Sequence, residues 1–208
     1  MTDNLPTPHR RNTSALLTFA FALLLTACTH ATSDTGKSEW TGLFPEDVKG
    51  MVWYNKALKF REPRLYRDGD LDGFTSRYRL SISGVTCTTY VIRIDETSSG
   101  RLTGMVRHHD RCKKGSIESH RLHPSRAKFD EIKGMIEKAG MFTHYPETWE
   151  LDDKDTICID GHQLLFERRD ARGYGISESN AQCTSPPKVR EIAKKFIAMS
   201  GEEVSVIL

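Results

Sequence analysis

The chain has almost no excess charge of one sign, because its 30 lysines and arginines are balanced by 28 aspartates and glutamates. A protein that binds nucleic acid needs clustered basic residues to neutralise phosphates. Here acidic and basic residues are interleaved, and the most basic stretch, residues 107–126, also contains several histidines. We interpret that stretch as a solvated strand and loop, with a polyanion site as the alternative. We expect no nucleic-acid partner.

The sequence also lacks the short motifs of common catalytic and cofactor sites. It contains no Gly-x-Ser-x-Gly elbow, no phosphate-binding loop and no dinucleotide-binding glycine motif. The carboxylates at 152–155 have no second group at a spacing that suggests acid and base roles. These absences favour a non-enzymatic protein with no catalytic residue and no cofactor. A periplasmic hydrolase whose site forms only in the folded chain is an alternative.

Long hydrophobic runs are missing as well. The most apolar stretch, Ala15–Leu25, is shorter than the roughly 20 residues that cross a bilayer. Arg10 and Arg11 precede it, and Leu25-Thr26-Ala27-Cys28 ends it. A basic start, a short apolar core and small residues at its end are typical of a secretory signal peptide. The last four residues resemble the lipobox of bacterial lipoprotein precursors, in which a leucine and two small residues precede a lipidated cysteine.

The lipoprotein resemblance implies that residues 1–27 are removed and that Cys28 becomes an acylated N-terminus. Each buried methylene contributes about 0.8 kcal/mol, so several acyl chains anchor a protein stably. Thr29 follows the cysteine, in place of the aspartate associated in this family with retention at the inner membrane. The resemblance therefore implies an outer-membrane anchor, with the protein facing the periplasm. We expect the small, polar residues of 28–44 to form a flexible tether.

Cysteine is scarce, with five in the chain, and Cys28 is assigned to lipid. The other four are an even number, as expected for disulfides in an oxidising compartment. Three connectivities are possible, and the spacing favours one of them. Cys87 and Cys112 are 25 positions apart, and so are Cys158 and Cys183. We predict the disulfides Cys87–Cys112 and Cys158–Cys183.

Each predicted disulfide encloses a β-hairpin pattern. Residues 86–95 are β-branched and strand-like, and 101–108 return after a turn-like segment. Directly opposed residues of a hairpin have a constant index sum, so opposed cysteines centre this turn between Ser99 and Gly100. The same argument centres the second turn between positions 170 and 171.

A helix pattern follows each hairpin. Apolar residues recur at helical spacing over 125–139 and 187–199, and glycines at 140 and 201 end the two patterns. The first unit has an insertion over residues 113–124, which we expect to be a loop.

These patterns predict a single α+β domain over 45–208. It is built from two repeated hairpin and helix units, about 74–140 and 150–201, which form an antiparallel sheet with both helices on one face. Before the first hairpin we expect a short helix within 45–60 and strands at 64–67 and 74–83.

Residues Asp68, Asp70 and Asp72, followed by Gly73, match the first half of a calcium-binding loop. The twelfth position of that loop requires a bidentate glutamate, but it is Arg79 here, and a cation repels the ion. We therefore expect a polar turn that leads into a strand, with calcium as the weaker alternative.

The histidines near Cys112 suggest zinc at first sight. On a strand, however, His108 and His109 point to opposite faces, and Cys112 is assigned to a disulfide. We expect no metal site there.

These features together favour a periplasmic protein that binds another protein and is held at the membrane by its lipid. A specific role is an inhibitor of, or an immunity protein against, an enzyme that attacks the cell envelope. An envelope structural or assembly lipoprotein is the alternative of another class. Aromatic and arginine side chains dominate protein interfaces where they are exposed. The candidate contact residues are Phe142, Tyr145, Trp149, Arg111 and His120.

Overall fold

The computed structural model describes the part of the chain that forms the predicted domain. The described residues are 44–45, 48, 62–67, 71, 73–84, 87–110, 112, 117–144, 147–148 and 161–201. Cys28 and the expected tether, which ends at 44, lie outside these residues except for Phe44, so lipidation stays a prediction. In the described part, no helix is both long and apolar enough to cross a membrane.

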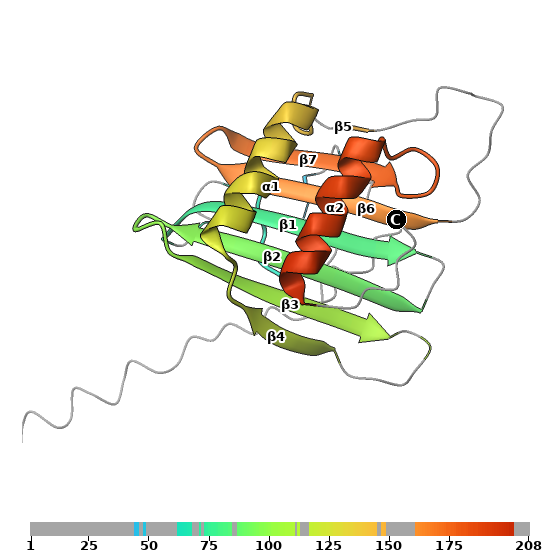
Figure 1. Cartoon of the computed structure of the whole chain (residues 1–208), viewed down its shortest axis with the longest axis horizontal. Helices are drawn as coiled ribbons and strands as arrows, with labels where there is room; N and C mark the ends of the chain where they lie inside the picture. Colours follow the sequence, from blue (N-terminus) through green and yellow to red (C-terminus); the bar gives the residue numbers. More distant parts are fainter. Residues whose placement is uncertain are drawn as a thin grey trace, which may run out of the picture. The chain divides into compact units, whose positions relative to one another are not determined.

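The domain is an antiparallel sheet of six strands with two helices, which confirms the predicted α+β class (Figure 1). The strand order is β4-β3-β2-β1-β6-β7, and the two-residue β5 (Glu147–Thr148) adds a short parallel pairing at the outer edge of β7. The strands are β1 (Phe74–Gly84), β2 (Thr88–Thr97), β3 (Leu102–Asp110), β4 (Glu118–Leu122), β6 (His162–Asp170) and β7 (Gly173–Asn180).

The two helices, α1 (Arg126–Ala139) and α2 (Pro187–Ser200), lie close to their predicted bounds and on the same face of the sheet (Figure 1). Each ends at a glycine in the left-handed region, Gly140 with φ 66° and Gly201 with φ 74°, where a side chain would be strained. Apolar residues spaced at three and four positions face the sheet. They are Phe129, Ile132 and Ile136 of α1 and Val189, Ile192 and Phe196 of α2.

Alternation along β1 gives the sheet two different faces. Tyr78, Leu80 and Ile82 are buried in the main core beneath the helices. Arg79, one position along, is also fully buried but points to the opposite face. A smaller apolar cluster lies on that second face and comprises Phe44, Val48, Leu165 and Ile176. Both faces of the central strands are therefore buried, one apolar and the other largely ionic.

The first hairpin confirms the disulfide Cys87–Cys112, with the two Cα atoms 5.2 Å apart. The predicted register is wrong by one position, because Thr88 pairs with Asp110 and the cysteines lie just beyond the strand ends, not directly opposed. The reason is the loop at 98–100, which has three residues because the Thr97 N–H donates to the Arg101 carbonyl at 3.0 Å, and which ends at Gly100 with φ 77°. A left-handed third residue is the usual solution for such a loop.

The second hairpin has a two-residue loop, because Asp170 pairs with Gly173. The turn centre lies between Ala171 and Arg172, one position after the predicted one. The Asp170 side chain stabilises this turn by accepting the backbone N–H of Arg172 at 2.9 Å. Cys158 lies outside the described residues, so the second disulfide stays a prediction.

Three other local predictions have mixed outcomes. The predicted strand at 64–67 is wrong, since residue 64 has no regular secondary structure and residues 65–67 form bends. The predicted loop at 113–124 contains the strand β4. Most of the expected helix at 45–60 lies outside the described residues.

The three aspartates of the calcium candidate, Asp68, Asp70 and Asp72, also lie outside the described residues. Beside them Gly73, with φ 82°, lies in a turn closed by the Phe74 N–H and the Leu71 carbonyl, and this turn leads directly into β1.

Candidate functional site

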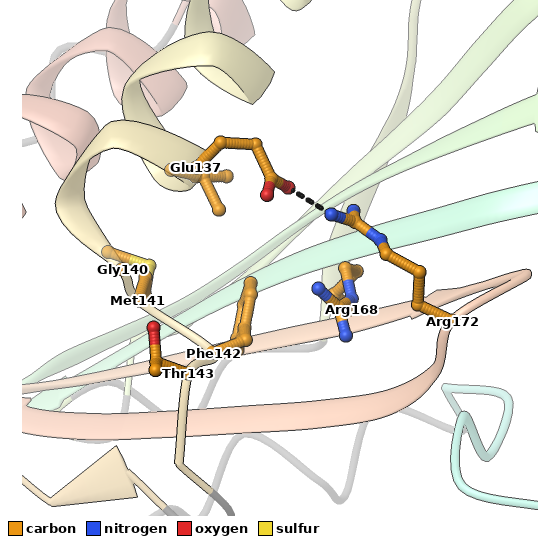
Figure 2. Close-up of a pocket in the computed structure, with 8 residues that line it drawn as sticks. Glu137, Gly140, Met141, Phe142, Thr143, Arg168 and Arg172 are labelled. Carbon is orange, nitrogen blue, oxygen red and sulfur yellow. Dashed lines mark hydrogen bonds and ion pairs between the residues drawn. The ribbon is translucent and has the colours of Figure 1, made fainter.

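A cavity of about 360 Å³ opens between the C-terminal end of α1 and the hairpin formed by β6 and β7 (Figure 2). The helix supplies Glu137, and the residues just after the helix supply Phe142 and Thr143. The strand β6 supplies Arg168, and the following turn supplies Arg172. Segments that are distant in sequence therefore place two guanidinium groups and an aromatic ring around one cavity.

Phe142 can occupy its position because the strand beneath it has a glycine. A Cβ atom at Gly175 would lie 3.0 Å from two atoms of the Phe142 ring, too close for a normal contact. Gly175 pairs directly with Arg168 across the hairpin. The Arg168 guanidinium carbon lies 4.9 Å from the centroid of the Phe142 ring, a cation–π distance. The absent side chain at Gly175 thus makes room for the ring on which Arg168 rests.

Arg172 is held by carboxylates on both sides of the cavity. Its Nη2 and Nε donate to Asp170 Oδ2 at 2.6 and 3.1 Å, and its Nη1 donates to Glu137 Oε1 at 2.6 Å. The hydrogen bonds that Arg172 donates to Asp170 and Glu137 raise the pKa of Arg172 above its ordinary value. Burial raises the pKa of Asp170, but the bonds from Arg172 outweigh it and the pKa is lowered overall. At neutral pH Arg172 and Asp170 are therefore both charged.

Arg168 is bound much less completely than Arg172. The residue is 7% exposed, and its closest charged partner is Asp170, with Nε to Oδ1 at 3.5 Å. Its Nε is buried without a hydrogen bond, and no residue in the described ranges accepts one from the rest of its guanidinium. Figure 2 shows the Arg168 side chain between Phe142 and Arg172. A buried cation with unused donors therefore lines the cavity.

Tyr78 lies close enough to this group for its ionisation to be affected. Burial, with the charge of Asp170 second, raises the pKa of Tyr78 to about 12. The phenol is therefore neutral at physiological pH and adds no negative charge opposite Arg168.

The predicted contact residues are not brought together. Phe142 lines the cavity near β6 and β7, whereas His120 is exposed on β4 at the opposite edge of the sheet. Arg111, Tyr145 and Trp149 lie outside the described residues. Arg168 and Arg172 were missed, although the sequence Arg168-Arg169-Asp170-Ala171-Arg172 concentrates charge at a turn. That charge density is the sequence signal that indicates the site, in addition to the turn.

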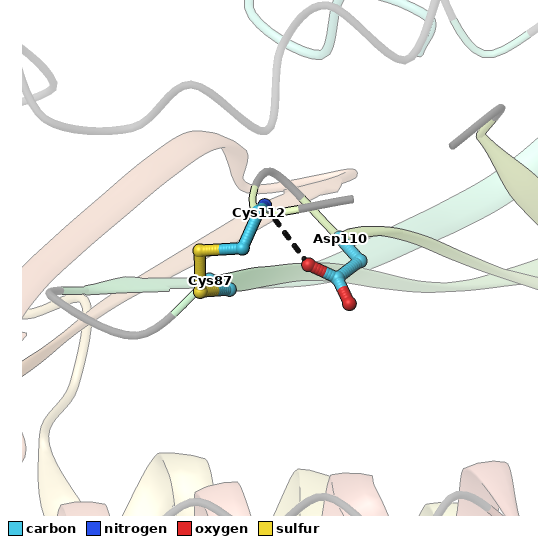
Figure 3. Close-up of a disulfide and its surroundings, with 3 residues drawn as sticks. All are labelled: Cys87, Asp110 and Cys112. Carbon is cyan, nitrogen blue, oxygen red and sulfur yellow. Dashed lines mark hydrogen bonds between the residues drawn. A yellow bond between two sulfur atoms is a disulfide. The ribbon is translucent and has the colours of Figure 1, made fainter. Parts of the chain in front are cut away.

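Among the described residues, one group could hold a metal ion by proximity alone: Cys87, Asp110 and Cys112 (Figure 3). The two sulfur atoms are joined in the disulfide, and Asp110 Oδ1 accepts the Cys112 backbone N–H at 3.0 Å. The nearby His108 Nε2 lies 3.3 Å from Glu118 Oε2. These contacts explain the group as the disulfide that joins the two strands at the open end of the first hairpin.

No protein-family model matches the chain, and no curated protein matches it significantly.

Proposed function

We propose that this chain is an outer-membrane lipoprotein, anchored through Cys28, whose periplasmic domain binds another protein without catalysing a reaction. The observation that carries the binding function is the Arg168 guanidinium, buried on the Phe142 ring beside an open cavity. Arginine and aromatic side chains in desolvated pockets are the commonest energetic centres of protein interfaces.

The disulfide Cys87–Cys112 supports the location. Disulfides form and persist in oxidising compartments such as the periplasm and are rare in reducing ones. A signal peptide that ends at a lipobox delivers a protein to that compartment. The disulfide and the N-terminal pattern are independent features of the chain, and they agree.

The finer architecture that we propose is a duplicated hairpin and helix. The hairpin β2–β3 is followed by the inserted strand β4 and then α1, and the hairpin β6–β7 is followed by α2, each helix ending at a glycine. By this correspondence Cys183 pairs with Cys158, as Cys112 pairs with Cys87. Mass mapping of non-reduced peptides should recover the Cys158–Cys183 link, and a link between the two units would contradict the duplication.

We propose that the partner is an enzyme that attacks the cell envelope and that the lipoprotein inhibits it. A domain with both sheet faces buried and a hairpin closed by a disulfide is preorganised. Such a surface loses little conformational entropy on binding, which favours tight inhibition.

Site-specific photo-crosslinking in cells tests this function. A photoreactive residue at Thr143, which is exposed and lines the cavity, should form an adduct with an envelope-directed enzyme. The matched control is Lys128, which is exposed near the start of α1, away from the cavity at the other end of that helix. The purified full-length chain should then lower the activity of the captured enzyme.

Equal labelling from both positions would remove the cavity as the contact site. A partner without enzymatic activity, captured only from Thr143, would favour the envelope assembly role instead of inhibition.

A further inference from the structure

We propose that the cavity beside Arg168 binds a carboxylate group, which the Arg168 guanidinium holds through a pair of parallel hydrogen bonds. The inference deepens the proposed function and rests on it in one respect, namely that a protein partner is expected to supply the carboxylate. The chemistry of the site itself is the same for an acidic side chain and for a small carboxylic acid.

Arg168 has unmet hydrogen-bonding capacity. Burial removes water from its Nε, which has no acceptor, because Asp170 Oδ1 approaches only to 3.5 Å. A buried charged group without hydrogen bonds is costly to a folded protein. An acceptor placed in the adjoining cavity would satisfy donors that the described part of the chain leaves unused.

The neighbours of the Arg168 guanidinium leave it donors for a ligand. Its carbon lies over the Phe142 ring, 4.9 Å from the ring centroid, and the ring takes up none of its N–H donors in a conventional hydrogen bond. A planar carboxylate matches two N–H donors of one guanidinium in a way that a point acceptor does not. The contact with Phe142 also limits the orientations that Arg168 adopts, which reduces the entropy lost on binding.

The charge around the cavity limits the charge of the ligand. The guanidinium groups of Arg168 and Arg172 and the carboxylates of Asp170 and Glu137 sum to zero charge, so a bound anion is held by the hydrogen-bond donors of Arg168 and not by excess positive charge. Each further negative charge on the ligand adds repulsion from Asp170 and Glu137. The site therefore favours a singly charged carboxylate over a phosphate dianion. A volume of about 360 Å³ accommodates a side chain as large as glutamate.

Titration of the full-length chain, purified in detergent, tests the proposal directly. The probes are N-acetyl-glutamate methylamide and its neutral isostere, N-acetyl-glutamine methylamide, and the signal is the Nε–H resonance of Arg168 measured by NMR. The acid should shift this resonance in a saturable manner, and the amide should not. Equal shifts from both probes, or tighter binding of inorganic phosphate than of the acid, would overturn the proposal.

Two variants show whether the paired N–H donors of Arg168 are responsible for binding the acid. Arg168→Lys keeps the charge but loses the paired donors, so the affinity for the acid should fall by about tenfold or more, the value of one charge-assisted hydrogen bond. Arg169→Gln, on the opposite face of the same strand, should bind as the wild type does. Unchanged affinity in Arg168→Lys would overturn the proposal even though the wild-type chain binds the acid.

A final comparison identifies the source of the carboxylate. A peptide with one internal glutamate should bind at least about tenfold more tightly than the single amino-acid derivative if a protein supplies the group, because flanking residues add contacts. Equal affinities would assign the site to a small carboxylic acid and would leave the carboxylate chemistry standing. Specific crosslinking at Thr143 without any effect of Arg168→Lys on acid binding would retain the protein-binding function and reject this inference alone.

Discussion

The Nε of Arg79 donates a hydrogen bond to Glu167 across 2.6 Å, and neither side chain is exposed to solvent. This ion pair joins β1 to β6, where the two halves of the sheet meet. The Tyr174 hydroxyl also donates to Glu167, at 2.9 Å, and Glu62 lies 3.9 Å from Arg79. Burial lowers the pKa of Arg79, but the charges of Glu167 and Glu62 outweigh it and the pKa is raised overall.

Removing one member of this pair should destabilise the domain strongly. In Arg79→Met the carboxylates of Glu167 and Glu62 remain buried without their shared cation, and such a loss costs about 3–5 kcal/mol. Urea unfolding of the oxidised chain measures the change. The double variant Arg79→Met with Glu167→Leu should be more stable than the single variant, because an apolar pair replaces the isolated charge. A single variant within about 1 kcal/mol of the wild type would show that the pair is dispensable.

Glu178 should make the stability of the domain depend on pH. Burial raises the pKa of Glu178 from 4.5 to about 7, although a hydrogen bond from Gln163 lowers it in part. Between these values the folded chain keeps a proton that the unfolded chain has released. The contribution to stability is thus fully present below pH 4.5 and is lost as the pH rises through about 7.

Glu178→Gln stays neutral at every pH and provides the comparison. The wild type should match the variant near pH 4.5 and fall below it by about 3 kcal/mol at pH 8, because each unit of pKa shift corresponds to about 1.4 kcal/mol. Burial lowers the pKa of His162 and acts in the opposite direction, but both proteins contain this histidine, so it cancels in the difference. Parallel stability curves for the two proteins would contradict the assignment.

Two glycine substitutions should have opposite effects on stability. A Cβ at Gly104 would lie 2.7 Å from the Arg93 carbonyl oxygen and 3.0 Å from Leu122 Cβ, so Gly104→Ala forces β2, β3 and β4 apart. Overpacking of this kind costs about 1–3 kcal/mol. Gly134 lies within α1 with no atom within 4 Å of its added Cβ, so Gly134→Ala should stabilise by about 0.5–1 kcal/mol. Thermal unfolding of the two variants measures the contrast, and loss of stability in both would contradict it.

Loss of the Cys87–Cys112 disulfide should destabilise the domain without changing its fold. The bond closes a loop with a sequence separation of 25. Without this constraint the unfolded chain gains conformational entropy, which lowers the free energy of unfolding by about 3 kcal/mol. Cys87→Ser with Cys112→Ser should therefore show an unchanged circular dichroism spectrum and a lower urea midpoint. A double variant as stable as the oxidised wild type would mean that strain in the bond offsets its constraint.

The elements that the sequence predicted well are those with a repeating local signal. Apolar residues at helical spacing and a terminal glycine placed α1 and α2 nearly to the residue. Equal cysteine spacing identified the first disulfide, which the structure confirms. The cysteine spacing did not set the register of either hairpin. The position of a turn depends on the length of its loop, which is three residues in the first hairpin and two in the second, and the cysteines of the first hairpin lie beyond the strand ends.

The candidate site could be predicted only in part. Phe142 was selected for its aromatic surroundings, but its partner Arg168 belongs to a strand 26 positions later in the sequence. Their contact depends on a glycine, Gly175, on a third segment. No local pattern encodes a contact among three segments, because each residue alone is compatible with a solvated surface. Likewise, nothing local to Arg79 indicates that its carboxylate partner is Glu167.

The central position of β1 has a consequence for how the molecule is made. The chain emerges with its N-terminal end first, so β1 to β4 can pair by successive hairpins before β6 has emerged. The residues Arg79 and Glu167 are separated by 88 positions, which at about 5–20 residues per second corresponds to roughly 4–18 s. During that interval the strand that will lie in the middle of the sheet has one unpaired edge and a cation without its main counterion. Nascent molecules therefore expose an unpaired strand edge that can pair with other chains. A holdase chaperone that covers this edge would raise the yield of the folded protein.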